Sequence, residues 1–105
     1  MFFSDYKQHP VANINPTLLW EYDLANFDYQ DMRNVVVQRV IERGRFNDYY
    51  AILNLYGEDG VIQAIKELPY LNDMDMNFVS IVFDIPVNQL RCYEKKQLPR
   101  RHWNS

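Results

Sequence analysis

The sequence predicts an all-α protein: a compact bundle of four to five short helices with an extended N-terminal arm and a basic C-terminal tail. Three observations lead to this prediction. A length of 105 residues suits one domain, and a hydrophobic content of 48% is enough for one core. Apolar residues recur at helical spacing between residues 29 and 68. Asn, Asp, Gly and Pro residues separate these runs, at positions where helices usually begin and end.

The chain divides into three segments. Residues 1–14 have no sustained hydrophobic period, so we expect an extended arm that is ordered only where its apolar residues meet a groove. Residues 15–90 hold the helical domain, which opens with Asn15 as a cap and Pro16 at the first helical position. Residues 91–105 form a basic, aromatic segment that we expect on or beside the domain.

The strongest helical pattern covers residues 29–43. Val36 and Val40 belong to one apolar stripe, and the polar residues fall mostly on the other side. Asp28 suits the N-cap, because its carboxylate can accept a hydrogen bond from a backbone N–H of the first turn. Gly44 suits the left-handed residue that often ends a helix.

Two further helices are predicted over residues 48–56 and 58–68. Asn47 is the expected cap of the first, and Gly57 is expected to separate the two.

The segment 73–83 contains the β-branched run NFVSIVF, which is also compatible with a buried strand. We favour a helix, because Asn72 can cap it and the chain offers no second strand for pairing. Val87 to Leu98 leaves room for one or two helical turns.

No motif predicts a metal, a cofactor or a catalytic residue. Asp73, Asp75 and Asn77 have the spacing that begins a calcium-binding loop, but Phe78 stands where such a loop needs glycine. We therefore interpret the carboxylates as a helix N-terminus. Cys92 and His102 would be a thiol and a base on a terminal tail, so we expect Cys92 to be a packing residue.

The run Trp20-Glu21-Tyr22-Asp23 alternates aromatic and acidic residues. It has the composition of a recognition patch, but we favour a structural role in which Trp20 and Tyr22 cover the bundle.

The charge of the chain is unevenly distributed. Residues 1–90 carry six Lys/Arg and thirteen Asp/Glu, a balance of −7, whereas residues 91–105 carry five Lys/Arg and one Glu, a balance of +4. The tail could bind an acidic partner protein, grip nucleic acid, or lie solvated beside the core. Its candidate binding residues are Arg91, Tyr93, Lys95, Lys96, Arg100, Arg101 and Trp103.

Several short motifs occur in an order that is similar to a known family. They are LWEYD at residues 19–23, RVIERG at 39–44, Tyr56-Gly57, NFV at 77–79 and Cys92-Tyr93. Over Asn15 to Asn104 the chain resembles an uncharacterised bacterial family of short helical proteins, often encoded beside AbiEii-type nucleotidyltransferase toxins. This resemblance implies an antitoxin-like or toxin-accessory role, and it implies no catalytic residues.

The sequence therefore predicts a non-enzymatic protein-interaction module, with a nucleotidyltransferase toxin as the partner that the resemblance implies. The alternative is a small nucleic-acid-associated regulator that binds through the tail. One cysteine and no long apolar run indicate a cytoplasmic protein without disulfides or membrane spans. The content of aromatic residues, 15%, is also compatible with a homodimer.

Overall fold

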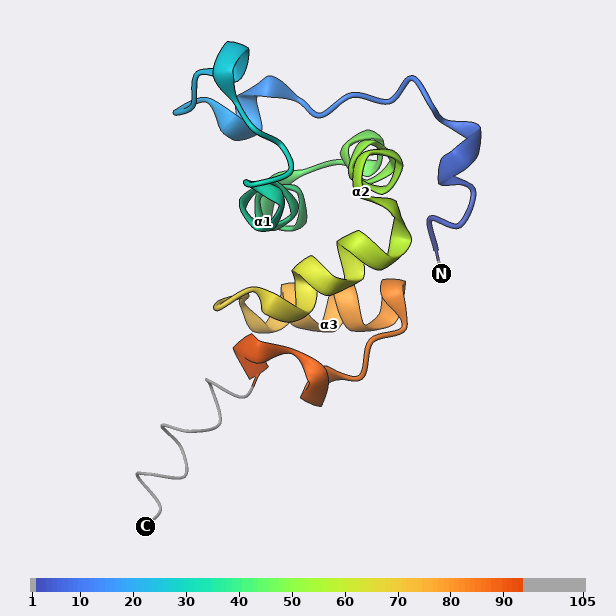
Figure 1. The fold of residues 1–105 in the computed structure, drawn as a ribbon. Helices are drawn as coiled ribbons and strands as arrows, with labels where there is room; N and C mark the ends of the chain where they lie inside the picture. Colours follow the sequence, from blue (N-terminus) through green and yellow to red (C-terminus); the bar gives the residue numbers. More distant parts are fainter. Residues whose placement is uncertain (1, 94–105) are drawn as a thin grey trace.

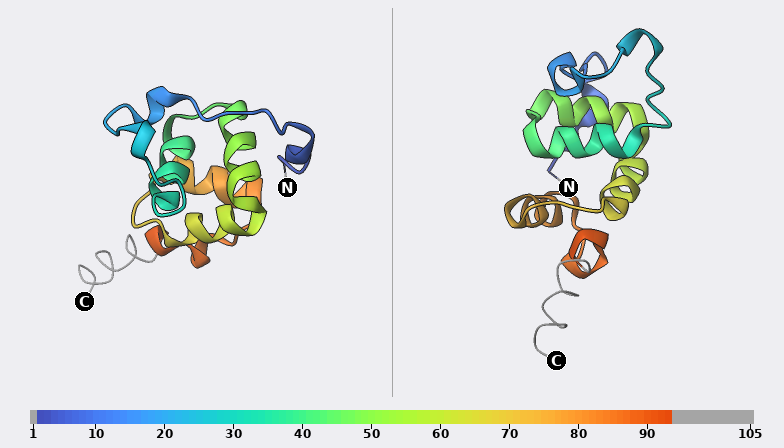
Figure 2. Two further views of the ribbon diagram at one scale, coloured as in Figure 1. Left: turned by 45° about the horizontal axis from the view of Figure 1, so that its top comes forward. Right: turned by 90° about the vertical axis from the view of Figure 1, so that its left-hand side faces the viewer.

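The computed structural model describes residues 2–93, which fold into helices joined by turns and loops (Figure 1, Figure 2). No β-strand occurs among these residues, so the predicted all-α fold class is confirmed. The α-helices are α1 (Arg33–Arg43), α2 (Phe46–Glu67) and α3 (Asp73–Phe83), and the 3₁₀ turns are η1 (Tyr6–Gln8), η2 (Pro16–Leu19), η3 (Leu24–Asn26) and η4 (Val87–Gln89).

Helix α1 begins at Arg33, four residues later than predicted. The Asp28 carboxylate does accept hydrogen bonds from the N–H groups of Gln30 and Asp31, but it caps a separate turn before the helix. The stripe of α1 that includes Val36 and Val40 is buried as predicted.

Gly44 ends α1 in a different way from the predicted left-handed stop. Its φ is −75° and its ψ is 166°, which is extended backbone that any residue can adopt. The need for glycine is steric: a Cβ atom there would lie 2.6 Å from the carbonyl oxygen of Val40.

Helix α2 consists of two helical segments that are separated at Gly57, as predicted. The helical segments meet at Gly57, which has φ 76° and ψ 164° and changes the direction of the helix (Figure 1). Helix α2 packs against α1. The figures show the first half of α2 beside α1 and the second half running beside α3 (Figure 1, Figure 2). This kink allows one helix to contribute to both layers of the domain.

The N-cap of α2 is Arg45, not Asn47 as predicted. The Asp48 carboxylate accepts a hydrogen bond of 2.8 Å from the Arg45 N–H, which fixes the start of the helix two residues earlier. The Asn47 side chain instead donates to the carbonyl oxygen of Asn13 in the arm, at 2.9 Å.

Helix α3 has the predicted bounds. The Asn72 side chain accepts a hydrogen bond from the Asp75 N–H at 2.7 Å, which is the expected cap. Asp73 and Asp75 occupy the first turn of α3, where the helix dipole favours carboxylates. The interpretation of these residues as a helix N-terminus is confirmed.

Phe3 is completely buried in the core. Its ring stacks on Tyr49 of α2, with centroids 4.8 Å apart, and lies 6.4 Å from the ring of Phe83 in α3. Cys92, beyond η4, is buried in the same core, as expected of a packing residue. The core thus includes side chains from both segments that flank residues 15–90.

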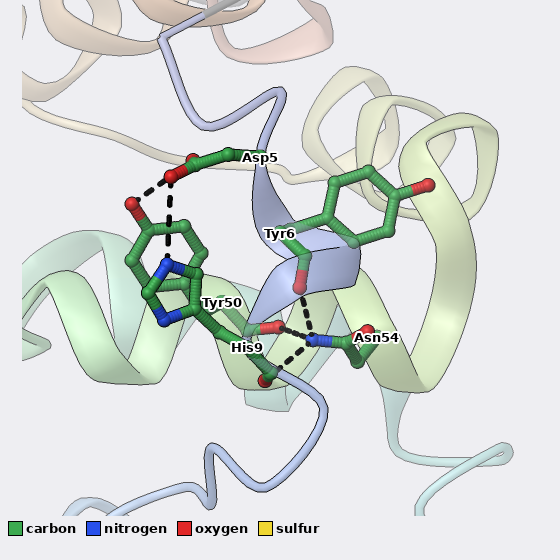
Figure 3. A network of polar contacts seen from close by, with 5 residues as sticks. All are labelled: Asp5, Tyr6, His9, Tyr50 and Asn54. Carbon is green, nitrogen blue, oxygen red and sulfur yellow. Dashed lines mark hydrogen bonds and ion pairs between the residues drawn. The ribbon is translucent and has the colours of Figure 1, made fainter.

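The arm is also fixed to α2 by polar contacts (Figure 3). The Asn54 side-chain amide donates to the carbonyl oxygens of Tyr6, at 2.9 Å, and His9, at 3.0 Å. The Tyr50 hydroxyl donates to Asp5 at 3.1 Å, and the His9 ring stacks on the Tyr50 ring. These contacts hold residues 5–9 against the first half of α2.

Candidate partner-binding surface

The tail residues proposed from the sequence fall mostly beyond the part of the chain that the structure describes. Arg91 is exposed, and its guanidinium donates to the Glu67 carbonyl oxygen at 3.5 Å. Tyr93 is half-buried against the core. The remaining candidates that lie outside the described residues are Lys95, Lys96, Arg100, Arg101 and Trp103.

Within residues 2–93, no group of three or more His, Cys, Asp or Glu side chains is placed to hold a metal ion. No described helix is long and apolar enough to cross a membrane. His102, the base considered beside Cys92, lies outside the described residues.

Trp20 faces solvent, so the prediction that it covers the bundle is wrong. Its side chain is 72% exposed, and it directly follows η2. Leu18 and Leu19 of that turn take the buried positions, which directs the next residue outward. Tyr22 is half-buried and packs edge-on against Phe27, with ring centroids 5.3 Å apart.

The backbone on both sides of Trp20 is attached to α1 through one side chain. The Arg39 guanidinium donates to the Leu18 carbonyl oxygen at 3.1 Å and forms an ion pair with the Glu21 carboxylate. Both anchors lie within two residues of Trp20. The indole is therefore exposed on a turn that is held in place.

The surroundings of Trp20 are acidic. Residues 10–32 contain four Asp/Glu and no Lys or Arg. Asp23 accepts hydrogen bonds from the Ala25 N–H and the Asn26 amide, so its carboxylate is fixed in position. Asp28 is fixed in the same way by the N–H groups of the turn that follows it.

A recess of about 320 Å³ opens between these carboxylates. Its apolar lining comes from Tyr22, Phe27 and Met32, and its polar lining from Asp23, Asn26 and Asp28. The segment that contains it lies above α1 in Figure 1, on the side away from α3. We call this surface the acidic aromatic edge, and it consists of Trp20, Glu21, Tyr22, Asp23, Phe27 and Asp28.

The far end of this segment is held by a tyrosine of α2. The Tyr56 hydroxyl donates to the Tyr29 carbonyl oxygen at 2.7 Å. The pKa of Tyr56 is raised to about 12, chiefly by burial and further by Tyr29, with Arg33 acting in the opposite direction. Tyr56 therefore remains protonated and donates this hydrogen bond throughout the neutral range.

The acidic aromatic edge was only partly predictable from the sequence. The alternation in residues 20–23 indicated a recognition patch as one alternative, whereas Phe27 and Asp28 gave no separate signal. The absence of any basic residue between residues 10 and 32 is the signal that would have extended the patch.

Residues 14–65 match the model of DUF6922, a family of unknown function. None of the curated proteins and none of the solved structures compared with this chain matches it. The matched segment contains the whole acidic aromatic edge, all of α1 and nearly all of α2, and it ends before α3.

Proposed function

We propose that this chain is a non-enzymatic protein-interaction module that binds its partner through the acidic aromatic edge. The observation that carries the proposal is Trp20, an exposed tryptophan on an anchored turn that is followed in the chain by Glu21 and Asp23. Tryptophan is enriched among the residues that dominate binding energy in protein interfaces. Because the backbone of this turn is already held by Arg39, it loses little conformational entropy on binding.

The charge of the edge indicates a partner with a basic surface. Complementary charge accelerates association and selects against acidic partners. Residues 10–32 carry a net charge of −4 from their Asp and Glu residues, within a body of −7 over residues 1–90.

A nucleotidyltransferase toxin is the partner that the sequence resemblance implies. An enzyme that binds nucleotides and RNA needs cationic groups for their phosphates. Carboxylates beside aromatic rings offer such a site negative charge and planar surfaces together. This chain would inhibit the toxin by covering its nucleotide or RNA site, or by displacing the acceptor RNA.

The test is an inhibition titration with an AbiEii-type nucleotidyltransferase toxin. The full chain is added at increasing concentration while nucleotide transfer to RNA is measured. We expect Trp20→Ala to raise the half-inhibitory concentration by about tenfold or more, as for a central interface tryptophan. Val11→Ala is the matched control, because Val11 is exposed and lies outside the edge. Full toxin activity at saturating wild-type protein would reject the toxin as the partner.

Nucleic-acid binding through the tail is the second candidate, favoured by the net charge of +4 over residues 91–105. About four phosphate contacts would give a log–log salt slope near −3.6. Joint charge reversal of Lys95, Lys96, Arg100 and Arg101 would remove this binding, whereas Trp20→Ala would leave it unchanged. The two variants therefore separate the two functions.

A further inference from the structure

A second surface, distinct from the acidic aromatic edge, is an apolar groove of about 630 Å³. It lies between the junction of α1 with α2 and the first two turns of α3. Its apolar lining comes from Ile41, Phe46, Tyr49, Met74 and Phe78. We call it the α1–α3 groove.

Two large side chains of the α1–α3 groove are exposed at its rim. Met74 is 79% exposed and Phe46 is 59% exposed. Phe46 is also in ring contact with Phe2, which is itself exposed, so the apolar surface continues beyond the groove. Contiguous apolar surface of this kind is typical of a contact site.

The groove carries one charge of each sign, on opposite walls. Arg45 lies at the start of α2 and Asp75 lies in the first turn of α3. Among residues 2–93 the ion pairs do not include either side chain. Each of these two charges is therefore available to a group from outside the domain.

This arrangement is complementary to itself. In a dimer with twofold symmetry, residue i of one copy meets residue j of the other, and residue j meets residue i. A twofold axis through the groove would bring Arg45 of each copy toward Asp75 of the other and would form two equivalent ion pairs. The same rotation would bring the protruding Met74 of each copy toward the groove of the other.

The distribution of charge also favours a copy of this chain at the groove. The lining of the groove is electrically balanced, although residues 1–90 carry a net charge of −7. The acidic aromatic edge lies on the other side of α1 from α3 (Figure 1, Figure 2). A dimer formed through the groove therefore keeps the two acidic aromatic edges apart. A dimer formed through the edge would bring their like charges together.

We propose that the α1–α3 groove is the interface of a symmetric homodimer, closed by reciprocal ion pairs between Arg45 of one copy and Asp75 of the other. The apolar side chains supply the burial, and the ion pairs set the register.

The state of Asp75 supports this proposal. Burial raises the pKa of its carboxyl group, so the charged form is not fully compensated in the isolated domain. Tyr49, which also lines the groove, has a raised pKa. The main cause is burial, and the charges of Asp75 and Asp48 raise it further. An arginine from the second copy would compensate the carboxylate.

The experiment is analytical ultracentrifugation of the full chain at low salt, over a range of concentration, with a charge-swap cycle. We expect the wild type to show a monomer–dimer equilibrium. Arg45→Glu and Asp75→Arg alone should each raise the dissociation constant by about tenfold or more, since close charge pairs are strongly coupled. The double variant, which restores opposite charges across the axis, should recover most of the loss.

Two further variants separate the interface from general effects on folding. Met74→Asp should be monomeric, and Val11→Asp, an equally drastic change at an exposed site outside the groove, should dimerise like the wild type. Circular dichroism of each variant verifies the fold. A wild type that stays monomeric at high concentration would overturn the proposal. The proposal would also be overturned if the wild type dimerised but the double variant had a dissociation constant no lower than that of either single variant.

Discussion

The backbone N–H of Asn15 donates a hydrogen bond of 2.8 Å to the carboxylate of Asp48, far along the chain. The other oxygen of the same carboxylate accepts the N–H of Arg45, also at 2.8 Å. Asp48 is only 4% exposed. One buried carboxylate therefore fixes the end of the N-terminal arm and the start of α2 relative to each other.

Replacement of Asp48 should destabilise the domain. Asp48→Ala leaves two N–H groups without their acceptor, and we expect a loss of about 2 kcal/mol in the free energy of unfolding. Asp48→Asn keeps one acceptor oxygen and should lose about half as much. Urea denaturation followed by circular dichroism measures both values. Equal stability of Asp48→Ala and the wild type would show that water replaces the carboxylate without cost.

Phe2 and Phe3 offer a matched pair for the contribution of the arm. Phe3 is fully buried between Tyr49 and Phe83, whereas Phe2 is 63% exposed. Phe3→Ala should cost about 3 kcal/mol or more, because it removes an aromatic ring from the core and leaves a cavity. Phe2→Ala should cost less than about 1 kcal/mol. Similar losses for the two variants, measured by thermal or urea unfolding, would contradict the burial of Phe3.

Gly57 and Gly44 should both resist substitution by alanine, for different reasons. At Gly57 an added Cβ meets no atom within 4 Å, but φ is 76°, so the cost lies in the backbone and is about 1–3 kcal/mol. At Gly44 the backbone is relaxed and the added Cβ meets Val40.

A second substitution tests the backbone at Gly57. With ψ at 164°, its positive φ lies in a region that essentially only glycine adopts, so Gly57→Asn should be about as destabilising as Gly57→Ala. Gly44→Asn should be at least as destabilising as Gly44→Ala, because the clash remains. The free energy of unfolding of the four variants is the measurement, and a stable Gly57→Asn variant would contradict the positive φ.

Stability should fall at alkaline pH. Burial raises the pKa of Tyr56 to about 12 from 10.0, so the folded state holds this proton more tightly than the unfolded state. The corresponding stabilisation is complete below pH 10 and is lost as the pH rises toward 12. Tyr49, whose pKa is also raised chiefly by burial, acts in the same direction. Tyr56→Phe should therefore lose stability less steeply than the wild type between pH 10 and 12, as measured by urea denaturation at each pH.

Arg39 should control the order of the Trp20 turn more than the stability of the domain. Its ion pair with Glu21 is partly exposed, and such pairs contribute about 1 kcal/mol or less. Arg39→Met removes both anchors of the turn, so the fluorescence anisotropy of Trp20 should decrease while the melting temperature changes little. A Trp103→Phe background leaves Trp20 as the single tryptophan. Unchanged anisotropy would show that Leu18 and Leu19 hold the turn without Arg39.

The parts of the fold that were predictable from the sequence are those set by local spacing. The bounds of α3 follow from the Asn72 cap and the apolar run, and the stripe of α1 follows from its period. The start of α2 was missed because a hydrogen bond from the Arg45 N–H to the buried Asp48 fixes it, and burial of an Asp is not visible in the sequence.

The burial of Phe3 and the exposure of Trp20 were not predictable for a related reason. Phe3 sits in an arm without periodicity, and its neighbours Tyr49 and Phe83 are distant in sequence. Trp20 follows two leucines, Leu18 and Leu19, that are both buried while it is exposed. In both cases tertiary contacts decide which of several large apolar residues is enclosed, and local pattern does not rank them.

The position of Phe3 between α2 and α3 has a consequence for folding during synthesis. Phe83, one wall of its site, leaves the ribosome long after Phe3 and after both α1 and α2. Contacts between α1 and α2 span short distances in the chain and can form early, whereas the enclosure of Phe3 must wait for α3. A nascent chain stalled before α3 should therefore leave its N-terminal residues open to a protease that spares the finished protein.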